Sequence, residues 1–204
     1  MGQTKILTET YTLANGVKIP KMGLGTWFIP DSEAAKTVCS AVKMGYRHMD
    51  TAQAYENERG VGEGIRSCGV ARESLFVTTK LAAEAKTYEE AAKAIDGSLE
   101  KMGLDYIDLM LIHSPQPWAD FRGGDYAEGN REAWRALEEA YKAGKLRAIG
   151  ISNFKEQDME NILSSCTVKS MVNQLLVHIG NTPFQVMEYC RKHDILVEAY
   201  SPVA

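Results

Sequence analysis

Short apolar runs alternate along this chain with longer segments in which apolar residues recur at helical spacing. Runs of this length bounded by polar residues are typical of buried strands. Before the first run, two short segments flank Asn15-Gly16, a pair that favours a tight turn and therefore predicts a β-hairpin. The strands predicted after the hairpin are Met22–Thr26, Tyr46–Met49, Leu75–Thr79, Ile107–Ile112, Leu146–Ile151, Val168–Asn173 and Ile195–Tyr200.

The segments between these runs predict helices, and three of them carry boundary signals. Thr87 and Glu90 have the spacing of a capping box, ahead of an apolar stripe that includes Ile95. A second helix presents Trp134, Leu137 and Tyr141 on one side, and Gly144 is expected to end it. Thr182-Pro183 predicts the start of a third, with Thr182 as its cap and proline at the first helical position.

Strands that alternate with helices indicate parallel βα units, which build either an open doubly wound sheet or a closed barrel. The open sheet that binds dinucleotides carries G-x-G-x-x-G at its first strand-to-helix turn. Gly23-Leu24-Gly25 lacks the third glycine, and Gly60-x-Gly62-x-Gly64 lies in a helical pattern. We therefore predict an α/β fold: a single TIM-type (β/α)8 barrel domain over residues 1–204, with an N-terminal β-hairpin. The eighth strand is absent from these residues, so we expect the natural polypeptide to continue beyond Ala204.

Composition and charge exclude several classes of function. The net charge is −4, and no stretch gathers Lys and Arg into a stripe, so we expect no nucleic-acid or membrane partner. The four cysteines lie far apart without a CxxC motif, and the N-terminus is polar. These features predict a cytoplasmic protein with reduced thiols. We expect it to be a monomer or weak homo-oligomer acting on a small molecule.

Polar side chains follow nearly every predicted strand, where barrel enzymes build their active sites. Asp50 and Tyr55 follow the second strand, Lys80 the third and His113 the fourth. Alone, each is more commonly a helix cap, a loop charge or a structural histidine, but their placement on one rim favours a site. The later strands end in Ser152-Asn153, Asn173-Gln174 and Tyr200-Ser201.

These residue types suit proton donation to an oxygen that gains negative charge. An ammonium such as that of Lys80 lowers the pKa of a nearby tyrosine, and a carboxylate holds the ammonium in place. A histidine opposite can orient a carbonyl oxygen. Nothing in the set supplies hydride, so a cofactor must. Tyr200 offers a face to a nicotinamide ring, and Ser152, Asn153 and Gln174 can hold its carboxamide.

Seven motifs, which follow one another along almost the whole chain, resemble those of the aldo-keto reductase family. They are Gly23-Leu24-Gly25-Thr26-Trp27, Met49-Asp50-Thr51-Ala52-x-x-Tyr55, Thr79-Lys80, Leu111-Ile112-His113, Gly150-Ile151-Ser152-Asn153-Phe154, Asn173-Gln174 and Ala199-Tyr200-Ser201-Pro202. The resemblance implies reduction of an aldehyde or ketone to an alcohol with NADPH, NADH not being excluded. It implies Tyr55 as proton donor, Asp50 and Lys80 as the groups that tune it, and His113 as a contact to the substrate oxygen. The implied cofactor contacts are Gly25, Thr26, Trp27, Asp50, Ser152, Asn153, Gln174, Tyr200 and Ser201.

Three departures from the family pattern affect the pocket. Ser114 follows His113 where the family usually has Trp, and Leu176 stands where relatives commonly place an acidic residue. The loop that binds the 2′-phosphate is absent together with the eighth strand. Trp27, Tyr55, His113 and Trp118 are the candidate substrate contacts, although the loop of Trp118 is as consistent with simple packing.

Two other functions remain open for such a chain. One is a cofactor-binding, redox-sensing subunit with little turnover, and the other is a Schiff-base lyase with Lys80 as nucleophile. We predict no metal site, because His48, His178 and His113 lack ligand spacing.

Overall fold

A parallel sheet forms the centre of the computed structural model, which describes residues 5–203. Within that range the sheet has seven strands, and they neighbour one another in chain order. The strands are β3 (Gly23–Gly25), β4 (His48–Asp50), β5 (Phe76–Leu81), β6 (Leu109–Ile112), β7 (Ile149–Ser152), β8 (Val172–Leu176) and β9 (Leu196–Tyr200). The expected alternation of strands and helices is confirmed.

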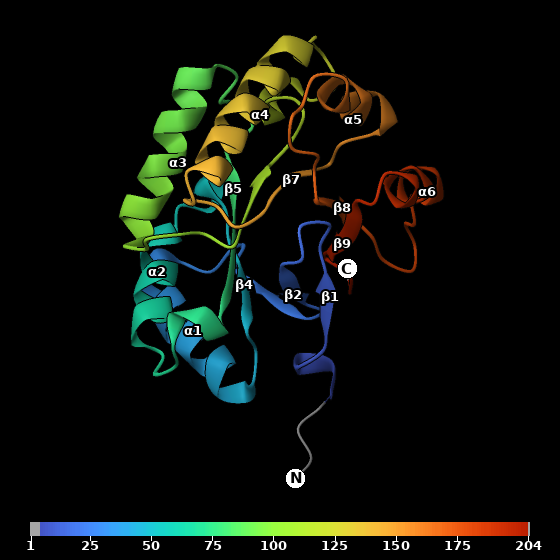
Figure 1. Ribbon diagram of the computed structural model, residues 1–204. Helices are drawn as coiled ribbons and strands as arrows, with labels where there is room; N and C mark the ends of the chain where they lie inside the picture. The colour runs from blue at the N-terminus through green and yellow to red at the C-terminus, as the bar shows by residue number, and fades with distance from the viewer. Residues whose placement is uncertain (1–4, 204) are drawn as a thin grey trace.

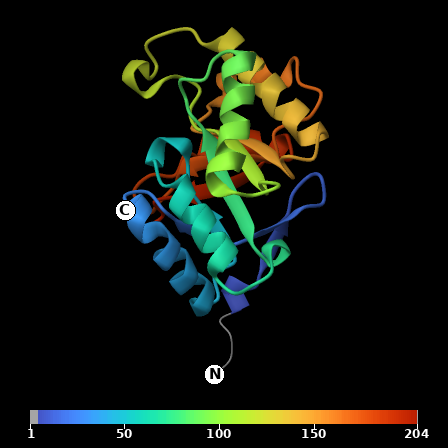
Figure 2. The same cartoon turned by 90° about the vertical axis from the view of Figure 1, so that its left-hand side faces the viewer.

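Six α-helices of the described residues connect these strands and cover the outer face of the sheet. They are α1 (Asp31–Met44), α2 (Glu58–Ser67), α3 (Tyr88–Met102), α4 (Ala127–Lys142), α5 (Glu156–Leu163) and α6 (Phe184–Lys192). Figures 1 and 2 show α1 to α4 packed side by side along one side of the molecule, with α5 and α6 beside the later strands. The hairpin of β1 (Thr10–Thr12) and β2 (Lys18–Pro20) lies at one end.

The sheet curves strongly enough to bring distant strands together. Three strands separate β4 from β8 in the sheet, yet Gln174 Nε2 on β8 lies 2.8 Å from Asp50 Oδ2 on β4. Such a contact across the concave face requires a sheet curled into a barrel. In the described residues β3 and β9 are its two end strands, and a cavity of about 340 Å³ lies between them. The predicted (β/α) barrel without an eighth strand in this sequence is therefore confirmed.

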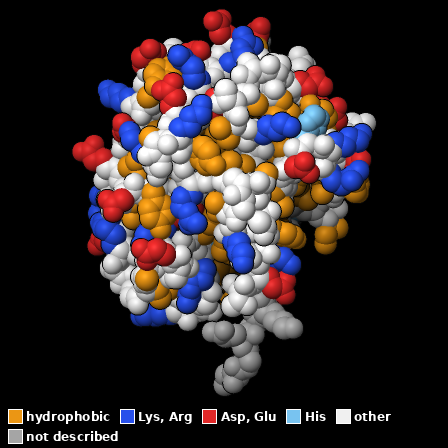
Figure 3. Space-filling view, in the orientation of Figure 1, with side chains coloured by type: hydrophobic (Ala, Val, Ile, Leu, Met, Phe, Trp, Pro, Cys, Tyr) orange, Lys and Arg blue, Asp and Glu red, His pale blue; other side chains and the backbone are white. Residues whose placement is uncertain are grey.

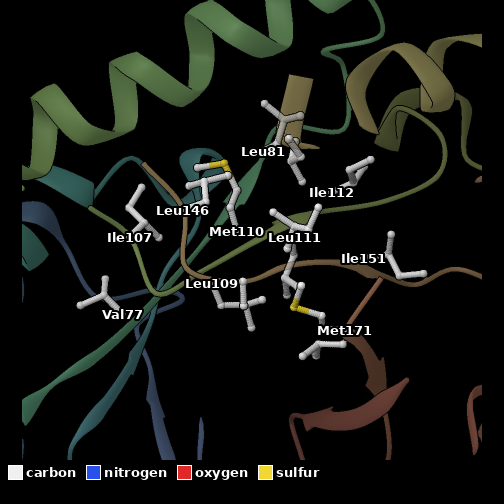
Figure 4. Packing of buried hydrophobic residues seen from close by; sticks show 14 of the residues in the cluster. Val77, Leu81, Ile107, Leu109, Met110, Leu111, Ile112, Leu146, Ile151 and Met171 are labelled. Carbon is white, nitrogen blue, oxygen red and sulfur yellow. The ribbon is translucent and has the colours of Figure 1, made fainter. Parts of the chain in front are cut away.

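The hydrophobic core is densest around β5, β6 and β7. Every residue of these three strands is buried. Figure 4 shows Val77, Met110 and Ile151 among the side chains packed there. Strands buried on both faces read as continuous apolar runs, because helices cover one face and the barrel interior the other.

Most local signals act as the sequence predicts. Thr87 and Glu90 form the capping box at the start of α3, and Gly144 adopts a φ of 78° just after α4. The expected cap at Thr182 is wrong: α6 begins at Phe184 without a side-chain cap. The hydroxyl of Thr182 instead donates to the carbonyl of His178.

The sixth predicted strand is displaced along the chain. It was expected at Val168–Asn173, whereas β8 begins only at Val172. Glu138 of α4 accepts hydrogen bonds from the backbone N–H groups of Thr167 and Val168. These side-chain bonds occupy the backbone that a longer strand would pair, so the segment before Val172 remains a loop.

Candidate active site

The ammonium group of Lys80 is the centre of the predicted catalytic set. Lys80 lies within β5, and its side chain is 1% exposed. Its Nζ lies 2.5 Å from Asp50 Oδ1, 2.9 Å from the carbonyl oxygen of Thr51 and 3.3 Å from the Tyr55 hydroxyl. An ammonium has three N–H donors, so these contacts satisfy it fully and allow the charge to be buried.

Tyr55 reaches this group from the short 3-10 helix Gln53–Tyr55 that follows β4. Gln53 fixes that turn: its amide nitrogen donates to Ser98 and to the carbonyl of Ala94 on α3, and its oxygen accepts from the N–H of Ala82. The turn is therefore attached to both α3 and the end of β5, which sets the position of the phenol.

Burial and charge act in opposite directions on Tyr55. Burial raises the pKa of Tyr55 above its ordinary value and Asp50 adds to this, whereas Lys80 lowers it. The lowering effect predicted for Lys80 is present, but burial outweighs it, so the phenol keeps its proton at neutral pH. Burial alone would lower the pKa of Lys80, but Asp50 and Tyr55 raise it above the ordinary lysine value, and the amine stays charged.

His113 stands opposite Tyr55 at the end of β6, with the two ring centroids 5.6 Å apart. Burial and the nearby Lys80 lower the pKa of His113 to about 3, so its imidazole is neutral. His113 Nδ1 is buried without a hydrogen-bond partner among residues 5–203, which leaves Nε2 as the nitrogen that can meet a ligand.

A cavity of about 440 Å³ opens above these groups. It is lined by Trp27, Ala54, Tyr55, His113, Trp118, Ser152, Asn153, Gln174 and Tyr200. Trp118 packs edge-on against His113, with ring centroids 5.4 Å apart, so the loop after β6 supplies one wall. Ser114 is fully buried and does not line the cavity, so Trp118 is the aromatic side chain that this loop contributes beside His113.

Some of the candidate cofactor residues use their polar groups in hydrogen bonds within the protein, whereas others have groups that remain available to a cofactor. Thr26 is buried, and both its N–H and its hydroxyl donate to the carbonyl of Asp50, so it joins two loops. The Asn153 amide accepts from the Tyr200 hydroxyl and donates to Ser152 and to the carbonyl of His113. A Cβ on Gly25 would meet open space.

The ring of Tyr200 and the side-chain oxygen of Gln174 are the groups best placed to meet a nicotinamide. Both residues line the cavity, and the contacts of the Gln174 side chain to other described residues all involve its nitrogen. Ser201 follows β9 with a left-handed φ of 48° and lines the adjacent cavity between β3 and β9. These groups fit a nicotinamide ring: Tyr200 offers an aromatic face, Gln174 an acceptor oxygen, and Tyr55 a nearby proton donor.

Sequence reasoning missed three polar residues that support this site. Gln53 anchors the turn of Tyr55. Asn57 accepts from Thr51 and donates to the carbonyls of Thr26 and Ile29, so it fixes the loop of Trp27. Glu198 accepts from Gln174 inside the barrel. A polar residue alternating with apolar ones in the seventh run was the only signal for Glu198.

The remaining surface is mixed in charge. Figure 3 shows Lys and Arg interspersed with Asp and Glu over the face it presents. None of the helices in the described residues combines the length and apolar character that a membrane crossing needs. All four cysteines are free thiols.

Comparison with known proteins places this geometry in a family. The sequence profile of the Aldo/keto reductase family matches residues 21–204. The chain is 44% identical to a glyoxal reductase of Bacillus subtilis, over 97% of this chain and 68% of that protein. It is 42% identical to a 9,11-endoperoxide prostaglandin H2 reductase of Trypanosoma cruzi, over 94% of this chain and 65% of that protein. The chain thus spans about two thirds of these relatives.

Solved structures agree with the sequence matches. An aldo/keto reductase from Brucella melitensis superimposes with a TM-score of 0.87 at 40% identity, over 96% of this chain and 73% of that one. A Bombyx mori aldo-keto reductase in complex with NADP superimposes with a TM-score of 0.83 at 35% identity. The match covers 95% of this chain and 66% of that one. The chain belongs to the aldo/keto reductase family.

Proposed function

We propose that this protein reduces an aldehyde or ketone to an alcohol with NADPH. The observation that carries the proposal is the contact of one buried ammonium, Lys80 Nζ, with both Asp50 and the Tyr55 hydroxyl beneath an open cavity. The names of the relatives, which include a glyoxal reductase, and the NADP held by a structural neighbour support the same activity.

In this mechanism the chain orients the carbonyl and delivers a proton. The reduced nicotinamide, when bound, supplies the hydride, and Tyr200, Gln174 and Trp27 are the residues that would hold it. His113 Nε2 donates a hydrogen bond to the substrate oxygen. Tyr55 gives its proton to that oxygen as negative charge develops there. Lys80 stabilises the phenolate that remains, and Asp50 keeps Lys80 charged.

The two alternatives are less consistent with the site. A Schiff-base lyase needs a neutral amine as nucleophile. Lys80 has a raised pKa and makes three polar contacts, so it stays protonated and has no lone pair with which to attack a carbonyl. A redox sensor without turnover does not require a tyrosine held against an ammonium.

Within the proposed function, the wall formed by Trp27 and Trp118 favours substrates with an apolar or flat body. The free thiols are those of a protein from a reducing compartment, so we propose that it acts in the cytoplasm.

Steady-state oxidation of NADPH in the presence of glyoxal tests the proposal, with NADH as the parallel arm. We expect carbonyl-dependent oxidation that is lost in Tyr55→Phe. NADPH bound without turnover of any of a panel of small aldehydes would favour the redox-sensing alternative. A borohydride-trapped adduct on Lys80 would favour the lyase.

A further inference from the structure

Two titratable side chains inside the barrel, one fully buried and the other 19% exposed, take no part in the proposed chemistry. His48 on β4 is 1% exposed, and its Nε2 lies 2.8 Å from the Thr78 hydroxyl. Its Nδ1 has no hydrogen-bond partner in the described part of the chain and lies 3.8 Å from Oε1 of Glu198 on β9. Both residues point into the barrel on the side of Asp50, so they sit next to the catalytic set.

Gln174 connects this pair to Asp50. Its side-chain nitrogen Nε2 lies 2.8 Å from Asp50 Oδ2 and 3.0 Å from Glu198 Oε2. A carboxamide nitrogen carries two N–H donors, so the two carboxyl groups use both. The amide oxygen is then the one polar atom of Gln174 that remains for a bound molecule. If the amide turned over, that oxygen would face the Asp50 carboxyl group that pairs with Lys80, and two acceptor oxygens would repel each other.

Asp50 and Glu198, which both accept from Gln174, form a clamp on its amide. The groups around Glu198 explain how its carboxyl group can lie inside the barrel. His48 and Asp50 on β4, Lys80 on β5 and Gln174 on β8 are the charged and polar groups that face it. Burial raises the pKa of Glu198 above its ordinary value, Asp50 adds to the rise, and His48 opposes it. A carboxyl group keeps an acceptor oxygen in either protonation state, so the bond from Gln174 does not depend on ionisation.

We infer that Glu198 is a positioning residue, which with Asp50 holds the amide of Gln174 so that its oxygen meets the N–H donors of a bound carboxamide. The inference rests on the proposed function, because the carboxamide is that of the nicotinamide. Glu198 acts through Gln174 and touches no reacting atom.

The clamp itself can be measured without cofactor. Nuclear magnetic resonance of the ¹⁵N-labelled full chain reports the motion and hydrogen exchange of the Gln174 side-chain amide. We expect a rigid, slowly exchanging amide in the native protein and in Glu198→Gln, whose amide oxygen can still accept. We expect faster motion and exchange of the amide in Glu198→Leu, which keeps only the hydrogen bond to Asp50. A freely rotating Gln174 amide in the native protein would overturn the inference, and this result needs no variant to fold.

Cofactor binding tests the consequence. Fluorescence titration compares NADPH with its 3-acetylpyridine analogue, which lacks the carboxamide N–H₂. We expect native protein and Glu198→Gln to prefer NADPH, and Glu198→Leu to lose about fivefold of that preference, the size of one neutral hydrogen bond. In a Gln174→Leu background, Glu198→Leu should change the preference no further.

An additional loss in the double variant would show that Glu198 acts independently of Gln174 and would overturn the inference. If the native protein binds no NADPH while its Gln174 amide is rigid and is released by Glu198→Leu, the proposed function fails and the clamp stands. The two failures are therefore distinguishable.

Discussion

The middle of the barrel wall and its last strand differ sharply in how they are packed. β5, β6 and β7 are buried along their whole length, whereas β9 is mostly half-buried and Cys190 is the one buried residue of α6. Both regions contribute to the site: Lys80 and His113 come from the first, Glu198 and Tyr200 from the second. The lysine that holds the Tyr55 hydroxyl and the histidine opposite it thus stand on or directly after the most buried strands, whereas Tyr200, assigned to the nicotinamide ring, stands on an end strand.

This difference indicates that chemistry and cofactor binding depend on different parts of the fold. A buried charge such as Lys80 needs surroundings that cannot relax or admit water, because an unsatisfied ion in the interior is costly. The ring of Tyr200 and the amide oxygen of Gln174 tolerate more movement, because a shift costs each of them only an uncharged contact with the nicotinamide. Substitutions in the two regions should separate these roles.

Lys80→Met should have the largest effect, because it removes a buried cation and leaves Asp50 without its partner. We expect a loss of unfolding free energy of roughly 3–5 kcal/mol and a large fall in kcat. Chemical denaturation and steady-state kinetics measure both. Lys145→Met is the control, since its ion pair with Asp96 is exposed and should contribute less than about 1 kcal/mol. Equal losses in the two variants would contradict the role of burial.

Tyr55→Phe should abolish proton donation while leaving the ring in place. We expect the reduction rate to fall by about 10²–10⁴-fold, the contribution of a general acid. We expect NADPH affinity to stay unchanged, because the substitution leaves the residues assigned to the nicotinamide intact. Single-turnover kinetics and fluorescence titration separate the two effects. A variant that keeps half of its activity would exclude Tyr55 as the donor.

A matched pair of leucines tests the packing difference directly. Leu111→Ala on β6 removes a fully buried side chain, so we expect a loss of about 2–5 kcal/mol. Leu196→Ala on β9 removes a half-buried one, and about 1 kcal/mol is expected. Thermal and urea unfolding provide the values. Similar losses at both positions would show that β9 is held as firmly as β6.

The neutral His113 predicts a pH dependence of stability. Its folded pKa of about 3 lies below the ordinary 6.5, so between these values the unfolded chain binds a proton that the folded chain does not. Stability should therefore fall with pH below about 6.5, at most by about 1.4 kcal/mol per pH unit from this residue. Urea unfolding from pH 7 to pH 4 should show a shallower fall in His113→Gln. Parallel curves would mean that His113 is not kept neutral by burial.

Tyr200→Phe should have the smallest effect. It removes the hydroxyl that donates to Asn153 Oδ1 over 2.9 Å, a bond worth about 1 kcal/mol, but keeps the ring. We expect a loss of stability of that size and a severalfold weaker affinity for NADPH, with kcat nearly unchanged. Tyr200→Leu, which also removes the aromatic face, should weaken binding further. A large fall in kcat for Tyr200→Phe would place β9 in the chemistry itself.

The sequence by itself determined the order of the strands and helices and which polar residues stand at the carboxyl ends of the strands. Apolar runs of strand length, the Asn15-Gly16 turn and the capping box of Thr87 act over a few residues, so local spacing predicts them. The end of each parallel strand also lies on one face of the barrel, and this places Asp50, Tyr55, Lys80 and His113 together.

Only the tertiary structure decided which groups meet across the barrel. The start of β8 depends on hydrogen bonds from Glu138 of α4, and the net pKa of Tyr55 depends on how deeply its ring is buried. In the clamp on Gln174, Glu198 is its register neighbour on the adjacent strand β9, whereas Asp50 on β4 reaches it because the sheet curls. Strand register and curvature are properties of the assembled sheet, so no local pattern in the sequence around Glu198 could reveal that Gln174 joins it to Asp50.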